Sequence, residues 1–218
     1  MKNVIVGWVL IVLLSFPAHP DPPLMARESY WEEHGIVLSG LSEERIEVLE
    51  STMRQLNSLE PGPLKINKGA YRRLSRFHEL FGSPFRGKAL SQWLLSKIRK
   101  ISYHNTWTVA VNQNQGTFIL GEMFFAKLSA LERLYLLIHE ARHSDEGGYD
   151  HVSCPKGFRF ISAAQPELDL EEEPSCDNRR DGAYAFQAAF LFELYAYGLI
   201  DQKEAGLLYN SSVSRLPP

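Results

Sequence analysis

Three histidines in the stretch LLIHEARHSDEGGYDH, residues 136–151, have a spacing that could serve metal chemistry. His139 and His143 are four residues apart, so on a helix both imidazoles project from one face, about one turn apart. Two such imidazoles can reach one tetrahedral zinc ion at about 2.0–2.1 Å. Glu140 lies beside the first histidine, where its carboxylate can take a proton from a water that the metal activates. The pattern therefore predicts a zinc site that supports hydrolysis.

Three residues are candidates for the third zinc ligand. His151 follows His143 by eight residues, and a Gly-Gly pair between them allows the chain to turn. Asp181, in RRDGAYA, is the alternative, and Glu193, in FLFEL, ranks last because its neighbours are those of a buried helix. We therefore expect His139, His143 and His151 to bind the ion, with Asp181 as the alternative third ligand.

The chain contains two cysteines, Cys154 and Cys176. In an exported protein an isolated pair is most simply a disulfide, and a loop of this size gives about 3 kcal/mol of stability on the chain-entropy model. The bridge would hold His151 and the acidic residues Asp177 and Asp181 in one neighbourhood, beside the end of the histidine helix. One of these residues could then bind zinc while another orients an imidazole.

The N-terminus has the pattern of an export signal. Lys2 supplies the positive charge, VIVGWVLIVLLSF (residues 4–16) is the apolar run, and Ala18 is a plausible last residue of the signal. The run falls short of the roughly 20 residues that cross a bilayer comfortably; a retained anchor is the alternative. We expect a signal peptide at 1–18, an extended lead-in at 19–40 and a single domain at 41–218, secreted or periplasmic and without a stable membrane span after processing.

The composition and net charge limit the classes of molecule that this chain is expected to bind. Apolar residues make up 44% of the 218 residues, which is enough for one domain with a proper core. The formal net charge of -3 gives no electrostatic reason to expect nucleic acid or an anionic membrane as partner. The expected partner is a peptide or protein substrate.

The N-terminal part of the domain has helical periodicity. After Ser42, a fair N-cap, an apolar stripe contains Ile46, Leu49, Met53 and Leu56, and Pro61 ends the pattern. Two further helices are predicted at residues 68–81 and 89–101.

The pattern then changes to β-branched and aromatic residues, which predict a hairpin of residues 106–111 with 117–120. Ser129 and Glu132 have capping-box spacing and mark the start of the histidine helix. Residues 147–181 are rich in glycine, proline and acidic residues and are expected to form a long loop. GAYAFQAAFLFELYAYGL, residues 182–199, is almost wholly apolar and predicts a buried C-terminal helix.

The order FILGEMFFAKLSALERLYLLIHEARH resembles the zincin metallopeptidases, in which the edge strand of a sheet leads into a helix with this motif. The resemblance covers roughly residues 106–199. It implies an α+β, zincin-like fold, with a small β-sheet or hairpin before the active-site helix, a helical N-terminal part and a buried C-terminal helix. It also implies zinc bound by His139 and His143, Glu140 as general base, and a peptide lying along the edge strand.

Narrower likenesses bear on the third ligand. RRDGAYA has the Asp-x-x-Tyr spacing of the aspzincins, which implies Asp181 as a ligand and Tyr184 as a residue that stabilises the oxyanion. The aspzincin Gly-Thr is missing, and Ala185 replaces the final glycine. Gluzincins take a glutamate from a following helix, which implies Glu193. Metzincins place the third histidine six residues after the second and need a later methionine; this chain has neither feature.

Two other functions stay open from the sequence. An exported binding protein could keep a structural metal, and four protein ligands would favour that function because catalysis needs an open position. A metal-dependent hydrolase of another amide bond, such as one in cell-wall material, would use the same residues. Tyr149 is a further candidate to support a developing oxyanion.

Overall fold

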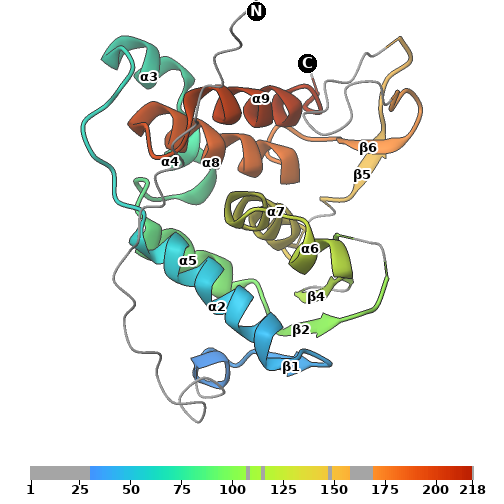
Figure 1. Cartoon of the computed structure of the whole chain (residues 1–218). Helices are drawn as coiled ribbons and strands as arrows, with labels where there is room; N and C mark the ends of the chain where they lie inside the picture. Colours follow the sequence, from blue (N-terminus) through green and yellow to red (C-terminus); the bar gives the residue numbers. More distant parts are fainter. Residues whose placement is uncertain (1–29, 107–108, 114–115, 147–148, 158–168, 218) are drawn as a thin grey trace, which may run out of the picture.

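The computed structural model describes residues 30–106, 109–113, 116–146, 149–157 and 169–217 (Figure 1). The expected signal peptide and residues 19–29 of the expected lead-in lie outside these ranges. Among the described residues, no helix has the length and apolar character that a membrane crossing requires.

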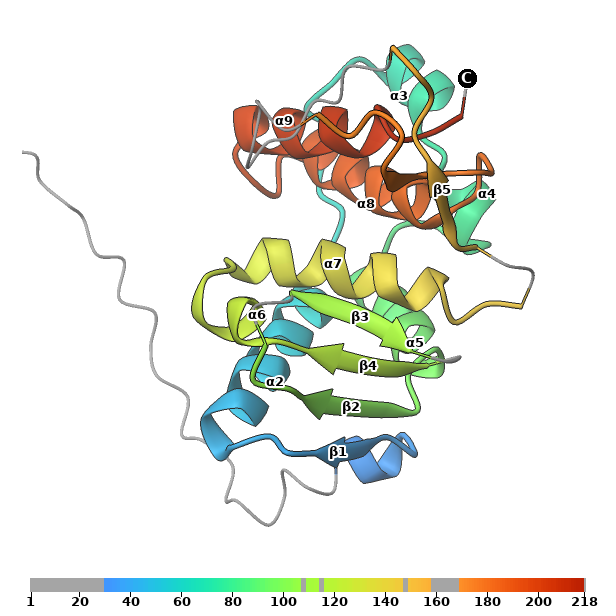
Figure 2. The ribbon, with the colours of Figure 1, turned by 90° about the vertical axis from the view of Figure 1, so that its right-hand side faces the viewer.

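A four-stranded mixed sheet forms one layer of the molecule. The strands β1 (Val37–Ser39), β2 (Lys100–Tyr103) and β4 (Thr117–Leu120) are parallel, and β3 (Ala110–Gln113) runs antiparallel to β4 at the edge. Val111 pairs with Ile119 in this hairpin, so the predicted hairpin is present, but its first strand is Ala110–Gln113 and not residues 106–111 as predicted. The α+β class is confirmed as well. Figure 2 shows the sheet face on, with β3 nearest to helix α7.

The helices α2 (Glu43–Ser58) and α5 (Gly87–Ser96) pack against each other behind the sheet (Figure 2). Ser42 caps α2, and the predicted stripe buries Leu49, Met53 and Leu56. Gly87 lets the two helices approach closely, because a Cβ there would lie 2.0 Å from the carbonyl oxygen of Leu56.

Two predicted helices differ from the observed ones. Residues 68–81 form two short helices, α3 (Lys68–Leu74) and α4 (Phe77–Phe81), because Ser75 takes an extended conformation and donates a hydrogen bond to Glu193 at 2.5 Å. The helix expected to reach residue 101 ends at Ser96. Ile101 instead belongs to β2, where pairing with β1 and β4 overrides its local helical pattern.

The histidine helix α7 (Ala130–Arg142) follows the short helix α6 (Glu122–Ala126). The predicted capping box is present: Ser129 Oγ accepts from the Glu132 N–H, and the Glu132 carboxylate accepts from the Ser129 N–H. α7 packs on β3 on one side and on α8 (Ala183–Tyr197) on the other. It therefore lies between the sheet layer and a second helical layer.

The helices α8 and α9 (Gln202–Val213) form the main part of that second layer, and α4 packs on α8. α8 is buried along most of its length, as predicted, whereas α9 was not predicted. The expected loop at 147–181 contains a two-stranded antiparallel ribbon, β5 (His151–Ser153) with β6 (Pro174–Asp177). The predicted disulfide between Cys154 and Cys176 is present and closes this ribbon.

The packed structure includes residues before 41. Trp31 and Ile36 belong to the same hydrophobic core as α2, α5, α7 and α8. Because β1 pairs with β2, this part of the expected lead-in is an integral strand of the sheet.

Candidate metal centre

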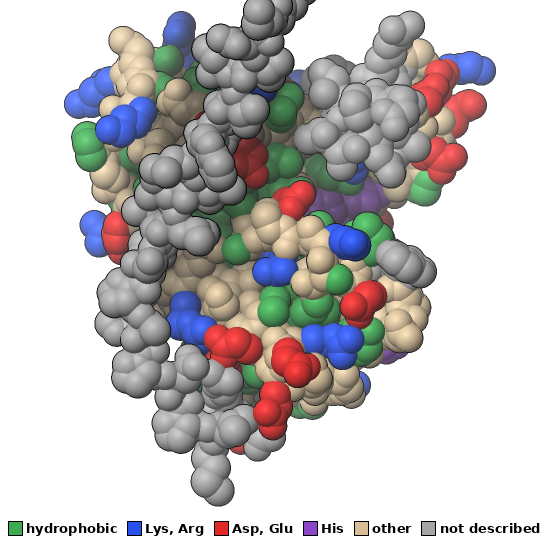
Figure 3. All heavy atoms as spheres, viewed as in Figure 1, with side chains coloured by type: hydrophobic (Ala, Val, Ile, Leu, Met, Phe, Trp, Pro, Cys, Tyr) green, Lys and Arg blue, Asp and Glu red, His purple; other side chains and the backbone are tan. Residues whose placement is uncertain are grey.

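Two elements, α7 and β5, supply the three histidines. His139 lies in the last turn of α7, His143 is the residue at which that helix ends, and His151 is the first residue of β5. The disulfide holds β5 against β6, and β6 leads into α8, which packs on α7. In Figure 3, which has the viewpoint of Figure 1, histidine side chains (purple) are visible between the upper and lower parts of the molecule.

The three imidazoles converge on one point. The Nε2 atom of His139 lies 3.1 Å from Nε2 of His151 and 3.3 Å from Nε2 of His143. Two ligands bound at about 2.0–2.1 Å to a tetrahedral ion stand about 3.3 Å apart, so this spacing fits a shared ion. The ligand atoms of all three histidines lie within 4.8 Å of one another, and the group could hold a metal ion.

Partners on the other ring nitrogens fix how two of these imidazoles point. His139 Nδ1 lies 3.1 Å from the amide oxygen of Gln187 on α8. His151 Nδ1 lies 3.4 Å from Asp177 Oδ1 at the end of β6. An imidazole that carries its proton on Nδ1 leaves the Nε2 lone pair for a metal. The contact with Gln187 therefore favours the tautomer of His139 that carries its proton on Nδ1. The Asp177 carboxylate favours the same tautomer of His151 through its charge, without a hydrogen bond.

Asp177 also connects the cluster to the start of α8. Its Oδ2 atom accepts the backbone N–H of Tyr184 at 2.9 Å and that of Ala185 at 3.3 Å. The neighbouring Gly182 must be a glycine, because a Cβ there would lie 2.4 Å from the Asp177 carboxylate. One buried carboxylate thus caps α8 and lies beside the imidazole of His151.

Burial favours the neutral form of the imidazoles of His139 and His143. Burial, followed by the nearby charges of His143 and His151, lowers the pKa of His139 well below its usual value. Burial is also the main reason why the pKa of His143 is lowered. Neutral imidazole is the form that binds metal, so the lowered pKa values of His139 and His143 favour metal binding over protonation at these two residues.

Glu140 is nine-tenths buried, beside the histidines and against the edge strand. Its Oε2 atom accepts the backbone N–H of Asn112 on β3 at 2.9 Å, and the Asn112 amide donates to the Glu140 carbonyl oxygen at 2.7 Å. Burial raises the pKa of Glu140 to about 7, although the Asn112 N–H and the charge of His151 oppose the increase. This carboxyl can therefore exchange a proton near neutral pH.

Tyr184 lies against the imidazoles. Its ring centroid is 4.5 Å from that of His139 and 4.9 Å from that of His151. Its hydroxyl accepts a hydrogen bond from Arg215, whose guanidinium carbon lies 4.4 Å from the centroid of the same ring. Sequence reasoning missed Arg215 and Gln187, and no motif surrounds either residue. Only the periodicity of α8 could have suggested Gln187, which lies one turn after Tyr184.

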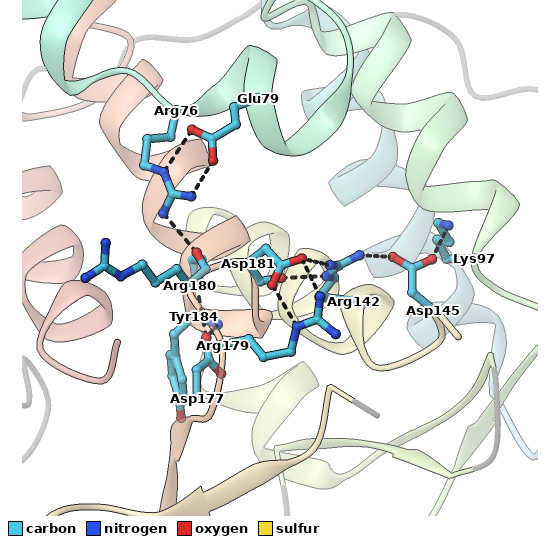
Figure 4. Close-up of polar contacts among 11 residues, drawn as sticks. Arg76, Glu79, Lys97, Arg142, Asp145, Asp177, Arg179, Arg180, Asp181 and Tyr184 are labelled. Atoms are coloured by element: carbon cyan, nitrogen blue, oxygen red, sulfur yellow. Dashed lines mark hydrogen bonds and ion pairs between the residues drawn. The ribbon is translucent and has the colours of Figure 1, made fainter. Parts of the chain in front are cut away.

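Asp181, the alternative ligand, lies in a charge cluster on another side of α7 (Figure 4). Arg142 and Arg179 contact its carboxylate, each at 3.0 Å, and Arg142 also donates to its carbonyl oxygen at 2.8 Å. Burial raises the pKa of Asp181, but the two arginines together lower it below the usual value. Both carboxylate oxygens are thus used by arginines, and among the described residues Asp181 does not belong to the histidine group.

The remaining candidates also have other partners. Glu193 accepts hydrogen bonds from Tyr71 at 2.9 Å and Ser75 at 2.5 Å, on the side of α8 that contacts α3. Tyr149 lies under the guanidinium of Arg142, 3.5 Å from its central carbon to the ring centroid. The structure therefore gives Glu193 a packing role and Tyr149 a place in the charge cluster.

Comparisons with protein-family models, with curated proteins and with solved structures found no match to this chain. The site therefore has to be interpreted from its own geometry. That geometry is a cluster of three buried or half-buried imidazoles, with a buried carboxyl of raised pKa and an arginine-bound tyrosine beside it.

Proposed function

We propose that this protein is an exported zinc-dependent hydrolase that cleaves peptide bonds. The observation that carries the proposal is the approach of His139, His143 and His151 at tetrahedral spacing, with Glu140 on the same helical turn. When bound, zinc would polarise the scissile carbonyl and activate a water. Three protein ligands leave a fourth position open, which favours catalysis over a closed structural site.

Glu140 is the residue suited to hold the proton. A general base works best when its pKa lies near the working pH, and burial raises the pKa of Glu140 to about 7. The Asn112 N–H fixes one carboxylate oxygen, so the other oxygen can accept a proton from water and return it to the leaving amine.

Tyr184 is suited to support negative charge on the substrate oxygen. Its hydroxyl accepts from Arg215, so the hydroxyl proton stays available for donation. Preorganised donors of this kind stabilise a developing oxyanion, and removal of one donor typically costs about 10²–10³ in kcat.

The architecture is consistent with a zincin-like enzyme. The antiparallel edge strand β3 lies next to the motif helix α7, and Asn112 joins them. We propose that a peptide lies along β3, with its scissile bond at the histidines. The disulfide supports export, because such bridges persist in oxidising compartments.

Metal content and activity test the proposal together. We expect plasma mass spectrometry of the mature protein to find about one zinc per chain, lost in His143→Ala and kept in Glu140→Gln. On a peptide mixture read by mass spectrometry, Glu140→Gln should lower the cleavage rate by about 10²–10⁴. The control is His78→Ala, which removes an exposed histidine from α4. Absence of zinc after reconstitution would rule out the proposed enzyme.

A further inference from the structure

A cavity of about 420 Å³ lies beside the metal centre, between α7, α8 and α9. His139, Tyr184 and Gln187 line it, so it borders the histidine cluster directly, and Tyr135 and Arg215 line it too. Its volume is in the range of small-ligand sites. The cavity extends away from the cluster, towards the C-terminal helix.

The backbone and one aromatic ring hold Arg215 in this cavity. The carbonyl oxygen of Arg215 accepts the N–H of Asp177 at 2.9 Å, which ties the segment after α9 to the residue beside His151. The guanidinium lies over the ring of Tyr184 and donates to its hydroxyl. Burial lowers the pKa of Arg215 to about 10, so the side chain stays a cation at neutral pH.

The charges in the cavity are separated along its length. Glu132 lies in the first turn of α7 and Glu204 in the first turn of α9, whereas the Arg215 cation follows the end of α9, beside the neutral imidazole of His139. The end next to the metal centre therefore attracts anions. Guanidinium matches the planar, bidentate geometry of a carboxylate.

We propose that this cavity binds a carboxylate of the substrate through Arg215, and that this group is the C-terminal carboxylate one residue beyond the scissile bond. The inference rests on the proposed function, since it names the substrate class of the same site. One tyrosine ring separates the guanidinium from the imidazoles. The Tyr184 ring centroid lies 4.5 Å from that of His139 and 4.4 Å from the guanidinium carbon of Arg215, so these two groups are at most 8.9 Å apart. One C-terminal residue, about 3.8 Å long and with a direct contact at each end, is long enough to reach across that distance. The enzyme would remove residues from the C-terminus of peptides.

Peptide binding by calorimetry tests this site without relying on turnover. The probes are acetyl-Ala-Ala-Ala with a free C-terminus, the same peptide as its C-terminal amide, and acetyl-Ala-Asp amide, each with the zinc-free and the zinc-loaded mature chain. We expect the free acid to bind at least about tenfold more tightly than the alanine amide, as loss of a charged hydrogen-bond partner implies. The preference should disappear in Arg215→Gln and persist in Arg72→Gln, an exposed arginine on α3.

Three outcomes would overturn the inference: equal binding of free acid and amide, binding of neither, or a preference that survives Arg215→Gln. If acetyl-Ala-Asp amide bound as tightly as the free acid, the carboxylate would come from a side chain and the C-terminal assignment would be wrong. Arg215→Lys provides a second test if Arg215→Gln does not fold: it keeps the charge but loses the bidentate geometry, so it should weaken the preference severalfold. Zinc content of the same samples tests the proposed function separately, because the zinc-free chain should still prefer the free acid.

Discussion

Arg142 and His143 are neighbours in the sequence, yet they face two different environments at the end of α7. His143 joins His139 and His151, whose Nε2 atoms face one another. Arg142 binds Asp181 at 3.0 Å and Asp145 at 2.5 Å, and it also lies over the rings of Tyr149 and Phe186. On the His143 side the ligand atoms converge on one point, whereas on the Arg142 side each carboxylate is bound by two cations, one of which is Arg142.

The difference shows which residues are available for a metal. In the charge cluster, Asp145 binds both Arg142 and Lys97, and Asp181 binds both Arg142 and Arg179 (Figure 4). A carboxylate bound by two cations would have to give up those contacts before it could bind zinc. The histidine cluster has no such competitor among the described residues, because its outer contacts are to Gln187 and Asp177 and leave Nε2 facing inward.

The largest effect is expected when one candidate ligand is removed from the histidine cluster and one from the charge cluster around Arg142. His151→Ala should weaken zinc binding more than about hundredfold, beyond the 10–100-fold that is typical of residues outside the ligand set. Asp181→Asn should change it less than about tenfold, because Asp181 contacts arginines. Competition with a chelating dye measures both. If the two variants lost zinc equally, the separation of the two sides would be wrong.

The second test removes the centre of the charge cluster. Arg142→Met leaves Asp145 and Asp181 with one cation each, and we expect the free energy of unfolding to fall by about 2–3 kcal/mol, since a buried pair loses one partner while Asp181 is partly exposed. Urea unfolding of the metal-free protein measures this loss.

The control for this variant is Arg72→Met, which changes an exposed arginine and should shift stability by less than about 0.5 kcal/mol. Zinc affinity of Arg142→Met should change less than about tenfold. A variant that kept its stability but lost zinc would show that Arg142 belongs to the metal centre.

Features with a local cause were predictable from the sequence. The capping box of Ser129 and Glu132, the apolar stripe of α2 and the helical spacing of His139 and His143 each depend on residues a few positions apart. The disulfide was predictable because the chain has a single pair of cysteines.

Features that depend on distant partners were not. β1 and β2 have three and four residues, too few to show a pattern, and they are strands because they pair with each other and with β4. Asp181 has the spacing of a ligand, but Arg142, 39 positions earlier, binds it. Arg215 reaches Tyr184 from 31 positions away. Such contacts are set by the packing of α8 and α9 and leave no local signal.

Glu140 allows the smallest and most specific test, because its carboxylate differs from those of the charge cluster. The pKa of Asp181 is lowered, since arginines outweigh the effect of burial, whereas burial raises that of Glu140 from 4.5 to about 7. Between pH 4.5 and about 7, the folded chain holds a proton at Glu140 that the unfolded chain has released. Its contribution to stability is therefore complete below pH 4.5 and is lost as the pH rises through 7.

Glu140→Gln removes this titration but keeps an oxygen that can accept the Asn112 N–H. In the metal-free protein, we expect the variant to gain about 2 kcal/mol of unfolding free energy over the wild type as the pH rises from 5 to 8. Urea unfolding at both pH values measures the gain. Asp181→Asn is the control: the pKa of Asp181 is lowered, so this carboxylate does not titrate between pH 5 and 8 and its removal should give no such gain. A constant difference between Glu140→Gln and the wild type would mean that Glu140 is ionised throughout. A gain at high pH would show that this carboxyl is kept at a cost to stability, as expected of a residue that serves the reaction at the histidines and not the packing of α7.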